Sequence, residues 1–268
     1  MNQTLSKEMQ QHTYAIMNRV EDSHWWYVGR RAILESFLER IIQNPKSKIQ
    51  NPKILDVGCG TGGNLEMLEK FGTAEGVDVS DDALEFCKSK GLTVHKGLAE
   101  KLPFEDESFD VVTALDVVEH LDDDVAGLKE MNRVLKKDGR TLIFVPAFMW
   151  LWGVQDDVSN HRIRYTKKQI VERLEKAGFG IERATYANIT FLAPILGGRT
   201  LMRITGIKPE SENNVNVSAL NGMFGKLFGA ERFWLKNFDF PFGVSIVIVA
   251  KKNLSAKSHE ENTKKNLL

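Results

Sequence analysis

Short apolar runs that end in turns alternate with segments of helical periodicity along most of the chain. Residues 53–58, KILDVG, form such a run, and Leu65, Leu68 and Phe71 then recur at helical spacing before Gly72. The same alternation predicts strands at 74–80, 92–97, 109–117 and 140–147, and helices at 81–91, 122–139 and 166–179. Strands that alternate with helices indicate a mostly parallel sheet covered on both faces.

Two further strands are expected after this alternation, at residues 181–188 and 243–252. Between them lies a long insertion, residues 189–242, in which the rhythm of strand and helix breaks. The last residues, 253–268, are polar and lysine-rich, which is typical of a disordered tail. Ahead of the first strand, a helix is predicted by apolar residues that recur on one side: Ile33, Leu34, Phe37, Leu38 and Ile41.

Composition and charge restrict the classes of protein to consider. Of the 268 residues, 42% are hydrophobic and 27% charged, enough for one large α/β domain with an insertion or for two small domains. Lys plus Arg equal Asp plus Glu at 36 each, which argues against a purely electrostatic binder of nucleic acid or membranes. Cys59 and Cys87 form no CxxC pair, so a reducing, cytoplasmic setting is favoured. The absence of a signal-peptide pattern and of any run of about eighteen apolar residues predicts a soluble protein.

The first strand-to-helix turn, DVGCGTGG, carries the strongest chemical signal. Gly58, Gly60 and Gly62 permit a sharp turn and a close approach of the backbone to a ligand. No lysine stands where a phosphate-binding loop needs one, and Asp56 would repel a pyrophosphate but suits a cation such as a sulfonium. Asp78, at the end of the second strand, is placed to accept hydrogen bonds from ribose hydroxyls. A nucleoside joined to a cation indicates S-adenosylmethionine.

Four segments in order, ILDVGCGTGGNLEML, GVDVS, GLAEKLPFEDESFDVV and VLKKDGRTLIFVPA, resemble the motifs of class I S-adenosylmethionine-dependent methyltransferases of the type 11-like group. The resemblance covers about residues 50–185 and implies a Rossmann-like sheet of seven strands whose last strand is antiparallel. Leu98 stands where the family usually has an Asp that binds adenine. The resemblance implies these cofactor-binding residues: Asp56, Gly58, Cys59, Gly60, Asp78, Val79, Ala99, Glu100, Leu115 and, from the N-terminal segment, Arg30.

Simpler interpretations exist for several of these residues. Asp56 could bond the amides of its own turn, and Asp78 could cap the helix that follows it. Cys59 fits a small packing residue better than a nucleophile, because no base is expected beside it. Trp25 and Trp26 fit either a hydrophobic staple for the N-terminal helix or part of a lid over the cofactor, in which Arg30 or Arg31 meets the methionine carboxylate.

The stretch DVVEHL, after the fourth strand, places Asp116, Glu119 and His120 where the cofactor's methyl group would face its acceptor. His161 lies in a later loop that opens at the same end of the sheet. The pair of segments resembles ubiquinone-pathway O-methyltransferases and small-RNA 3′-terminal 2′-O-methyltransferases, whose matching positions hold a divalent metal. The resemblance implies Mg²⁺, Mn²⁺ or Zn²⁺ on Asp116, Glu119, His120 and His161. There are two alternatives to a metal site. His120 or His161 acts as a general base without a metal, or the cluster is purely structural.

The insertion is rich in aromatic residues and contains few lysines. It fits a helical cap with its own core or a substrate lid, and as a lid it favours a small or lipid-like acceptor, with possible peripheral contact with a membrane. The expected organisation is an N-terminal helical lid or cap (1–48), the cofactor-binding core (49–188), the insertion (189–242), the last strand (243–252) and the tail (253–268).

The sequence therefore predicts an S-adenosylmethionine-dependent methyltransferase, with O-methylation of a small or lipid-like acceptor favoured. An RNA ribose 2′-O-methyltransferase is an alternative that the balanced charge and the lack of a basic stripe disfavour. A regulatory protein that binds the cofactor without turnover is a third hypothesis. The acceptor and the oligomeric state are left open.

Overall fold

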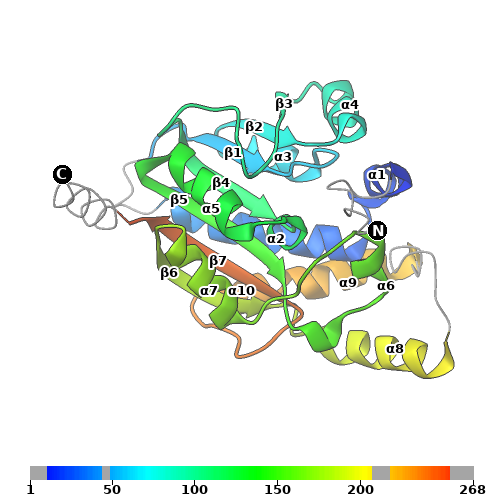
Figure 1. Ribbon diagram of the computed structural model, residues 1–268. Helices are drawn as coiled ribbons and strands as arrows, with labels where there is room; N and C mark the ends of the chain where they lie inside the picture. Colours follow the sequence, from blue (N-terminus) through cyan, green and yellow to red (C-terminus); the bar gives the residue numbers. More distant parts are fainter. Residues whose placement is uncertain (1–10, 44–48, 207–217, 254–268) are drawn as a thin grey trace, which may run out of the picture.

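The computed structural model describes residues 11–43, 49–206 and 218–253. A seven-stranded sheet runs through it in the order β3-β2-β1-β4-β5-β7-β6 (Figure 1). The strands are β1 (Lys53–Val57), β2 (Thr73–Asp78), β3 (Val94–Lys96), β4 (Phe109–Leu115), β5 (Leu135–Pro146), β6 (Phe179–Ala187) and β7 (Ser245–Lys252). β7 is antiparallel to both β5 and β6, whereas the pairs among β1 to β5 are parallel. The predicted sheet with an antiparallel last strand is confirmed.

Helices cover both faces of the sheet, as the alternating pattern predicted (Figure 1). The longer helices are α1 (Gln11–Val20), α2 (Trp25–Ile42), α4 (Asp81–Ser89), α5 (Asp124–Val134), α7 (Lys167–Lys176), α8 (Leu192–Thr205) and α9 (Ser218–Gly229). The short ones are α3 (Gly63–Leu68), α6 (Val154–Val158), α10 (Glu231–Leu235) and two 3₁₀ turns, η1 (Val118–His120) and η2 (Met149–Leu151). No helix in the described ranges has both the length and the apolar character needed to cross a membrane.

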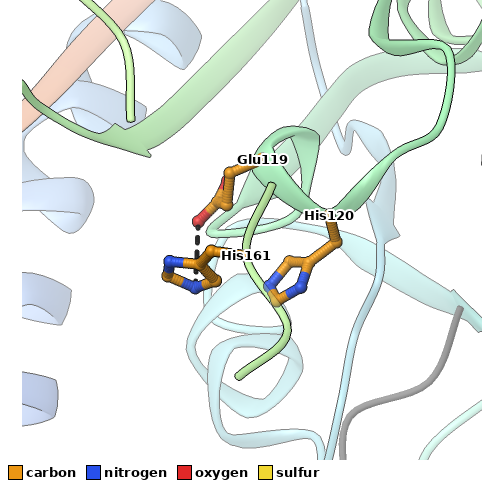
Figure 2. A group of neighbouring side chains, drawn as sticks. All are labelled: Glu119, His120 and His161. Atoms are coloured by element: carbon orange, nitrogen blue, oxygen red, sulfur yellow. Dashed lines mark ion pairs between the residues drawn. The ribbon is translucent and has the colours of Figure 1, made fainter. Parts of the chain in front are cut away.

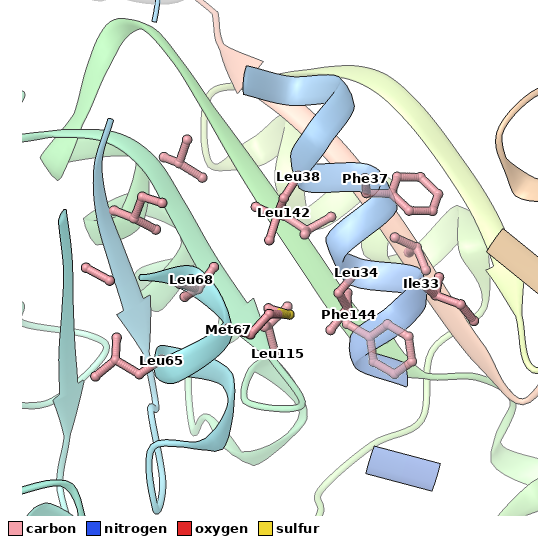
Figure 3. Packing of buried hydrophobic residues seen from close by; sticks show 14 of the residues in the cluster. Ile33, Leu34, Phe37, Leu38, Leu65, Met67, Leu68, Leu115, Leu142 and Phe144 are labelled. Atoms are coloured by element: carbon pink, nitrogen blue, oxygen red, sulfur yellow. The ribbon is translucent and has the colours of Figure 1, made fainter. Parts of the chain in front are cut away.

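The strands bury side chains on both faces, so successive residues of one strand enter different cores. Leu142 and Phe144 pack with α2, α3 and α4 on one face, while Ile143 and Val145 pack with α5 and α7 on the other. Figure 3 shows Leu34 and Leu38 of α2 beside Leu142 and Phe144. The N-terminal helix predicted from its apolar side is thus a core helix that supports the sheet.

One difference from the predicted elements has a clear cause, and the predicted helical insertion is present. The helix expected over 122–139 ends at Val134, because Leu135 pairs with Phe109 and starts β5 early. The insertion forms α8, α9 and α10, and Phe228 and Leu235 pack into the core beside α2. Most of the predicted tail, from residue 254, and part of the predicted N-terminal segment lie outside the described residues.

The strand order reverses beside β1, since the chain passes from β1 to β2 and β3 and returns to β4 on the other side. In open sheets of this kind, ligands bind at the carboxyl ends of the strands next to such a reversal. The turns after β1, β2, β4 and β5 therefore surround the expected site.

Candidate active site

The turn after β1 has the backbone that the glycines predicted. Gly58, Gly60 and Gly62 all have positive φ, at 69°, 54° and 94°. A β-carbon on Gly58 would lie 2.4 Å from the Val117 side chain, so the turn accepts no larger residue without displacement. The loop is therefore shaped by close packing against the segment after β4.

Asp78 joins this turn to the end of β2. One of its carboxylate oxygens accepts a hydrogen bond from the N–H of Gly60 at 2.9 Å, and the other accepts from the N–H of Ser80 at 2.9 Å. Ser80, rather than Asp78, is the N-cap of α4 and accepts from Ala83. Asp78 is thus fixed in orientation by backbone donors, at the edge of the cavity described next.

A cavity of about 870 Å³ opens at the carboxyl ends of the strands. It is lined by nine of the ten residues expected to bind the cofactor: Arg30, Gly58, Cys59, Gly60, Asp78, Val79, Ala99, Glu100 and Leu115. The tenth, Asp56, does not line it. Asp56 is buried inside the sheet, where its carboxylate accepts a 2.6 Å hydrogen bond from the Thr113 hydroxyl, and burial raises its pKa to about 7.

The position of Asp56 corrects the charge argument made from the sequence. A carboxylate that faces the sheet interior and has a raised pKa is a weak source of negative charge for a cationic ligand. Asp78 and Asp116, unlike Asp56, are carboxylates that line the cavity itself.

Arg30 lies between the N-terminal helix and the end of β4. Its guanidinium forms an ion pair with Asp116, donates to the Asn64 side chain at 2.8 Å and stacks over the Trp26 ring at 4.7 Å. Asp116 has a φ of 61°, unusual for a residue other than glycine, and this turn aims it toward Arg30. In this arrangement Asp116 is committed to Arg30 and does not join the predicted metal ligands.

The other three predicted ligands converge, as Figure 2 shows. Glu119, His120 and His161 offer ligand atoms that all lie within 4.8 Å of one another. The rings of His120 and His161 are 4.7 Å apart and nearly perpendicular, and His161 Nε2 is 3.9 Å from a carboxylate oxygen of Glu119. Residues that are more than forty positions apart in the sequence thus meet at one point.

Glu119 is the least satisfied member of this group. It is fully buried, and neither carboxylate oxygen has a hydrogen-bond partner among the described residues. Burial, with the nearby charge of Asp116, raises the pKa of Glu119 well above its ordinary value. A buried carboxyl without partners is stable when protonated or when a cation reaches it, so the donor set of one oxygen and two nitrogens fits a divalent metal.

The two histidines differ in their surroundings. Burial, with the neighbouring His161 and Arg162, lowers the pKa of His120 to about 3, so His120 is neutral and weakly basic at neutral pH. His161 has a carboxylate behind it: its Nδ1 is 2.8 Å from Asp156 Oδ1. When the Nδ1–H of His161 donates this hydrogen bond to Asp156, Nε2 carries no proton and can act as an acceptor.

Asp156 and its arginine partners were not identified from the sequence. Arg164 donates to Asp156 Oδ1 at 2.7 Å, and Arg199 of α8 lies 3.5 Å from the other oxygen. Burial alone would raise the pKa of Asp156, but the bond with His161 and the charges of Arg164 and Arg199 outweigh it and hold the pKa below its usual range. Asp156 is therefore a fixed anion that orients His161.

The walls beyond the histidines are apolar. Phe191, Ile195 and Met202 from the insertion line the cavity, together with Phe224 of α9 and Trp25 of α2. The rings of Trp25 and Phe191 are 4.4 Å apart. On the opposite side, Tyr14, Met17 and Glu21 of the N-terminal segment also line the cavity.

The N-terminal segment is attached to the cofactor side by Glu21. Its carboxylate accepts from the Thr61 hydroxyl at 2.9 Å and from Lys90 at 2.8 Å. This contact places α1 beside the glycine turn, in the position expected of a cover for a bound cofactor.

Comparison with known proteins agrees with this architecture. Residues 55–143 match the family model described as "Methyltransferase domain". A demethylmenaquinone methyltransferase of Chlorobaculum parvum is 38% identical over 116 residues, covering 40% of this chain and 48% of that relative. The chain thus spans about half the length of this curated relative.

Two solved structures are similar in fold. One is a Thermotoga maritima protein described as a SAM-dependent methyltransferase, possible histamine N-methyltransferase, at 22% identity and a TM-score of 0.55 over 90% of this chain and 100% of that one. The other is a structure described as a complex between the Haloferax volcanii Trm112 methyltransferase activator and "the putative methyltransferase", at 18% identity and a TM-score of 0.61 over 92% of this chain and 100% of that one. At these identities the likeness concerns the fold.

Proposed function

We propose that this chain, which carries a class I S-adenosylmethionine-dependent methyltransferase domain, transfers a methyl group to a hydroxyl oxygen of an apolar, lipid-like acceptor. The supporting observation is the single cavity that joins the glycine turn and Asp78 to His161 and to an apolar wall. The relative from Chlorobaculum parvum is named for demethylmenaquinone, an apolar quinone, which agrees with the apolar character of the acceptor and does not bear on the atom that receives the methyl group.

The cofactor would bind at the carboxyl ends of β1 and β2. Asp78 would accept hydrogen bonds from the ribose, and the glycine turn lets the backbone approach the methionine portion closely. Arg30 and Arg31 both line the cavity, and one of them would meet the carboxylate of the methionine portion. S-Adenosylmethionine supplies an electrophilic methyl group, whose bond electrons leave on sulfur.

The acceptor would lie between this methyl group and the apolar wall. Its hydroxyl oxygen forms the new bond to carbon, and its proton passes to Nε2 of His161, which Asp156 holds in the required tautomer. Alignment of acceptor and methyl group in a closed cavity contributes most of the rate, and the base adds to it.

One specific observation favours a second arrangement around the same acceptor. The carboxyl of Glu119, which has no hydrogen-bond partner among the described residues, and two imidazoles form a mixed donor set that suits Zn²⁺ or Mn²⁺ better than Mg²⁺, which prefers oxygen ligands. Glu119, His120 and His161 would hold such an ion, which would bind and polarise the acceptor hydroxyl, and Asp156 would orient His161 as a ligand.

Transfer of label from S-adenosylmethionine to a total lipid extract tests the proposal, with a water-soluble extract as the comparison. With His161 as base, we expect His161→Gln to lower transfer by about 10²-fold to 10⁴-fold. His120→Gln should lower it much less, and chelation should have no effect. With a metal, chelation should abolish transfer, and both variants should be about equally inactive.

Each part of the proposal has a contrary result. Label that enters only the water-soluble extract would contradict the apolar acceptor. Tight cofactor binding by calorimetry without transfer into either extract would favour a binding protein without turnover.

A further inference from the structure

Exposed apolar side chains are concentrated in one part of the sequence. Fourteen large apolar side chains of the described residues are exposed, and all but Val28 and Leu98 lie at 149–150 or between 196 and 242. Scattered exposed apolar residues are normal on soluble proteins, but a concentration of them marks a surface that contacts a partner or a membrane. The insertion therefore exposes more apolar side chains than the rest of the described chain.

We use the name rim surface for six of these residues, five of them on α8 or α9, the two helices that flank the cavity, and one beside α8. They are Trp150, Leu201, Ile204, Leu220, Met223 and Leu227. Ile204 is 79% exposed, Leu201 61% and Met223 56%. Trp150 is held next to α8 because its carbonyl accepts a 3.1 Å hydrogen bond from Arg203.

The rim surface is continuous with the inside of the cavity. Leu201 lines the cavity and is also largely exposed, so the apolar wall reaches the outside at this point. On α9, Phe224 lines the cavity next to the exposed Met223. The rings of Phe191 and Phe224 are 5.5 Å apart, which brings the start of α8 against α9 across the cavity.

The packing of α9 explains why its apolar residues face outward. Gly225 and Gly229 lie against α2, where added β-carbons would come within 3.4 Å of Val28 and 3.1 Å of Ala32. Leu220, Met223 and Leu227, at spacings of three and four, follow another side of the helix and remain exposed. Packing in the core of the protein therefore does not explain why these three positions are apolar.

The charge of the two helices indicates what kind of surface they fit. Arg199, Arg203 and Lys226 are their charged residues, and neither helix contains an acidic one. Arg199 is buried beside Asp156, so the charge that α8 and α9 expose is positive. Apolar side chains flanked by a few basic ones are complementary to the surface of an anionic bilayer.

We propose that the rim surface binds the surface of an anionic lipid bilayer, with Leu201, Ile204 and Met223 inserted among the lipids and Arg203 and Lys226 near the headgroups. An apolar acceptor then enters the cavity between α8 and α9 without passing through water. The route of the acceptor rests on the proposed function, whereas the bilayer contact does not. A second copy on the rim surface would instead cover the point at which Leu201 opens the cavity.

Flotation of the full-length protein with vesicles tests this contact directly. We expect binding to vesicles of phosphatidylcholine with phosphatidylglycerol, and binding about tenfold weaker to phosphatidylcholine alone, because only two basic residues contribute. The double variant Ile204→Ser/Met223→Ser should bind about tenfold more weakly than the wild type. Neither residue lines the cavity, so cofactor affinity measured by calorimetry should be unchanged and would show that the variant is folded.

The matched control is Phe233→Ser/Phe242→Ser, which removes two exposed aromatic residues outside the rim surface and should leave vesicle binding close to that of the wild type. Three results would overturn the proposal: no flotation of the wild type, an equal loss in the control variant, or a homodimer in sedimentation that Ile204→Ser/Met223→Ser dissociates. Flotation without any methyl transfer would contradict the proposed function and leave the bilayer contact standing.

Discussion

The two sides of the cavity are built from the chain in different ways. On the cofactor side, the glycine turn and Asp78 come from one short stretch, and the Asp78 carboxylate is satisfied by the backbone N–H groups of Gly60 and Ser80. On the acceptor side, Glu119, His161 and Arg199 come from three separate segments, and Glu119 has no hydrogen-bond partner among the described residues.

The cofactor side is thus organised mainly by local backbone, and the acceptor side by contacts between charged groups that are distant in the sequence. Much of the geometry of the cofactor side is local, because the positive φ values of the glycine turn direct the N–H of Gly60 toward Asp78. The acceptor side contains a buried carboxyl that is stable only if it is protonated or meets a donor or a cation. Substitutions should therefore separate cofactor binding from transfer.

The largest effect is expected from Asp156→Asn. The substitution keeps the shape of the side chain but removes the charge that orients His161, so we expect transfer, measured as kcat/KM, to fall about 10²-fold to 10³-fold. Cofactor affinity should change by less than about threefold, because Asp156 contacts only the acceptor side.

Asp157→Asn is the matched control for this prediction. Asp157 is adjacent in sequence, but it is exposed and accepts from the Trp152 indole at 2.9 Å. An equal loss of transfer in both variants, or a loss of cofactor affinity in Asp156→Asn, would show that the two sides are not separate.

The same contrast explains what could be predicted from the sequence. β1, β4 and the glycine turn follow from apolar runs and glycines, whose effect on the backbone is local. The placement of Asp78 follows as well, because it ends a strand next to the turn. Asp56 was misplaced because a carboxylate on a buried strand was assumed to face the ligand, whereas alternation along the strand turns it toward Thr113.

Asp156 could not be recognised because its role depends on residues distant in the chain. It lies in a segment without clear periodicity, and Arg164 and Arg199 become its partners only when α6 and α8 are packed. The convergence of Glu119, His120 and His161 was suggested by resemblance, but the ion pair that removes Asp116 from the group needed the position of Arg30 in three dimensions. Buried charge networks of this kind leave no local pattern.

An intermediate effect is expected from Asp78→Ala, which tests the cofactor side. Loss of hydrogen bonds to a carboxylate should weaken S-adenosylmethionine binding by about 1 to 3 kcal/mol in calorimetry. Part of this loss comes from the glycine turn, because the N–H of Gly60 loses its acceptor.

The control for Asp78→Ala is Asp81→Ala, an exposed carboxylate in the first turn of α4 that pairs with Lys96. Its affinity for the cofactor should match that of the wild type. Unchanged affinity in a folded Asp78→Ala variant would remove Asp78 from the binding site.

The smallest effect concerns His24, where the N-terminal cover meets the rest of the cavity. His24 is buried, and its Nδ1 accepts from the N–H of Trp26 at the start of α2. Burial lowers its pKa to about 4, below the ordinary value near 6.5. The unfolded chain therefore takes up a proton between pH 6.5 and 4 that the native protein refuses, and the free energy of unfolding falls as the pH drops through this range.

His24→Asn should remove this sensitivity, because asparagine can accept the same hydrogen bond but does not titrate. The free energy of unfolding of each protein is measured in denaturant at pH 7.5 and at pH 5.5. The loss between the two pH values should be smaller in His24→Asn than in the wild type by about 1 to 2 kcal/mol. His24→Ala separates the two roles, since loss of the cap should lower stability at every pH, by about 1 kcal/mol. If His24→Asn lost stability between pH 7.5 and 5.5 as steeply as the wild type, the acid sensitivity would arise from other groups, and His24 would be a cap alone.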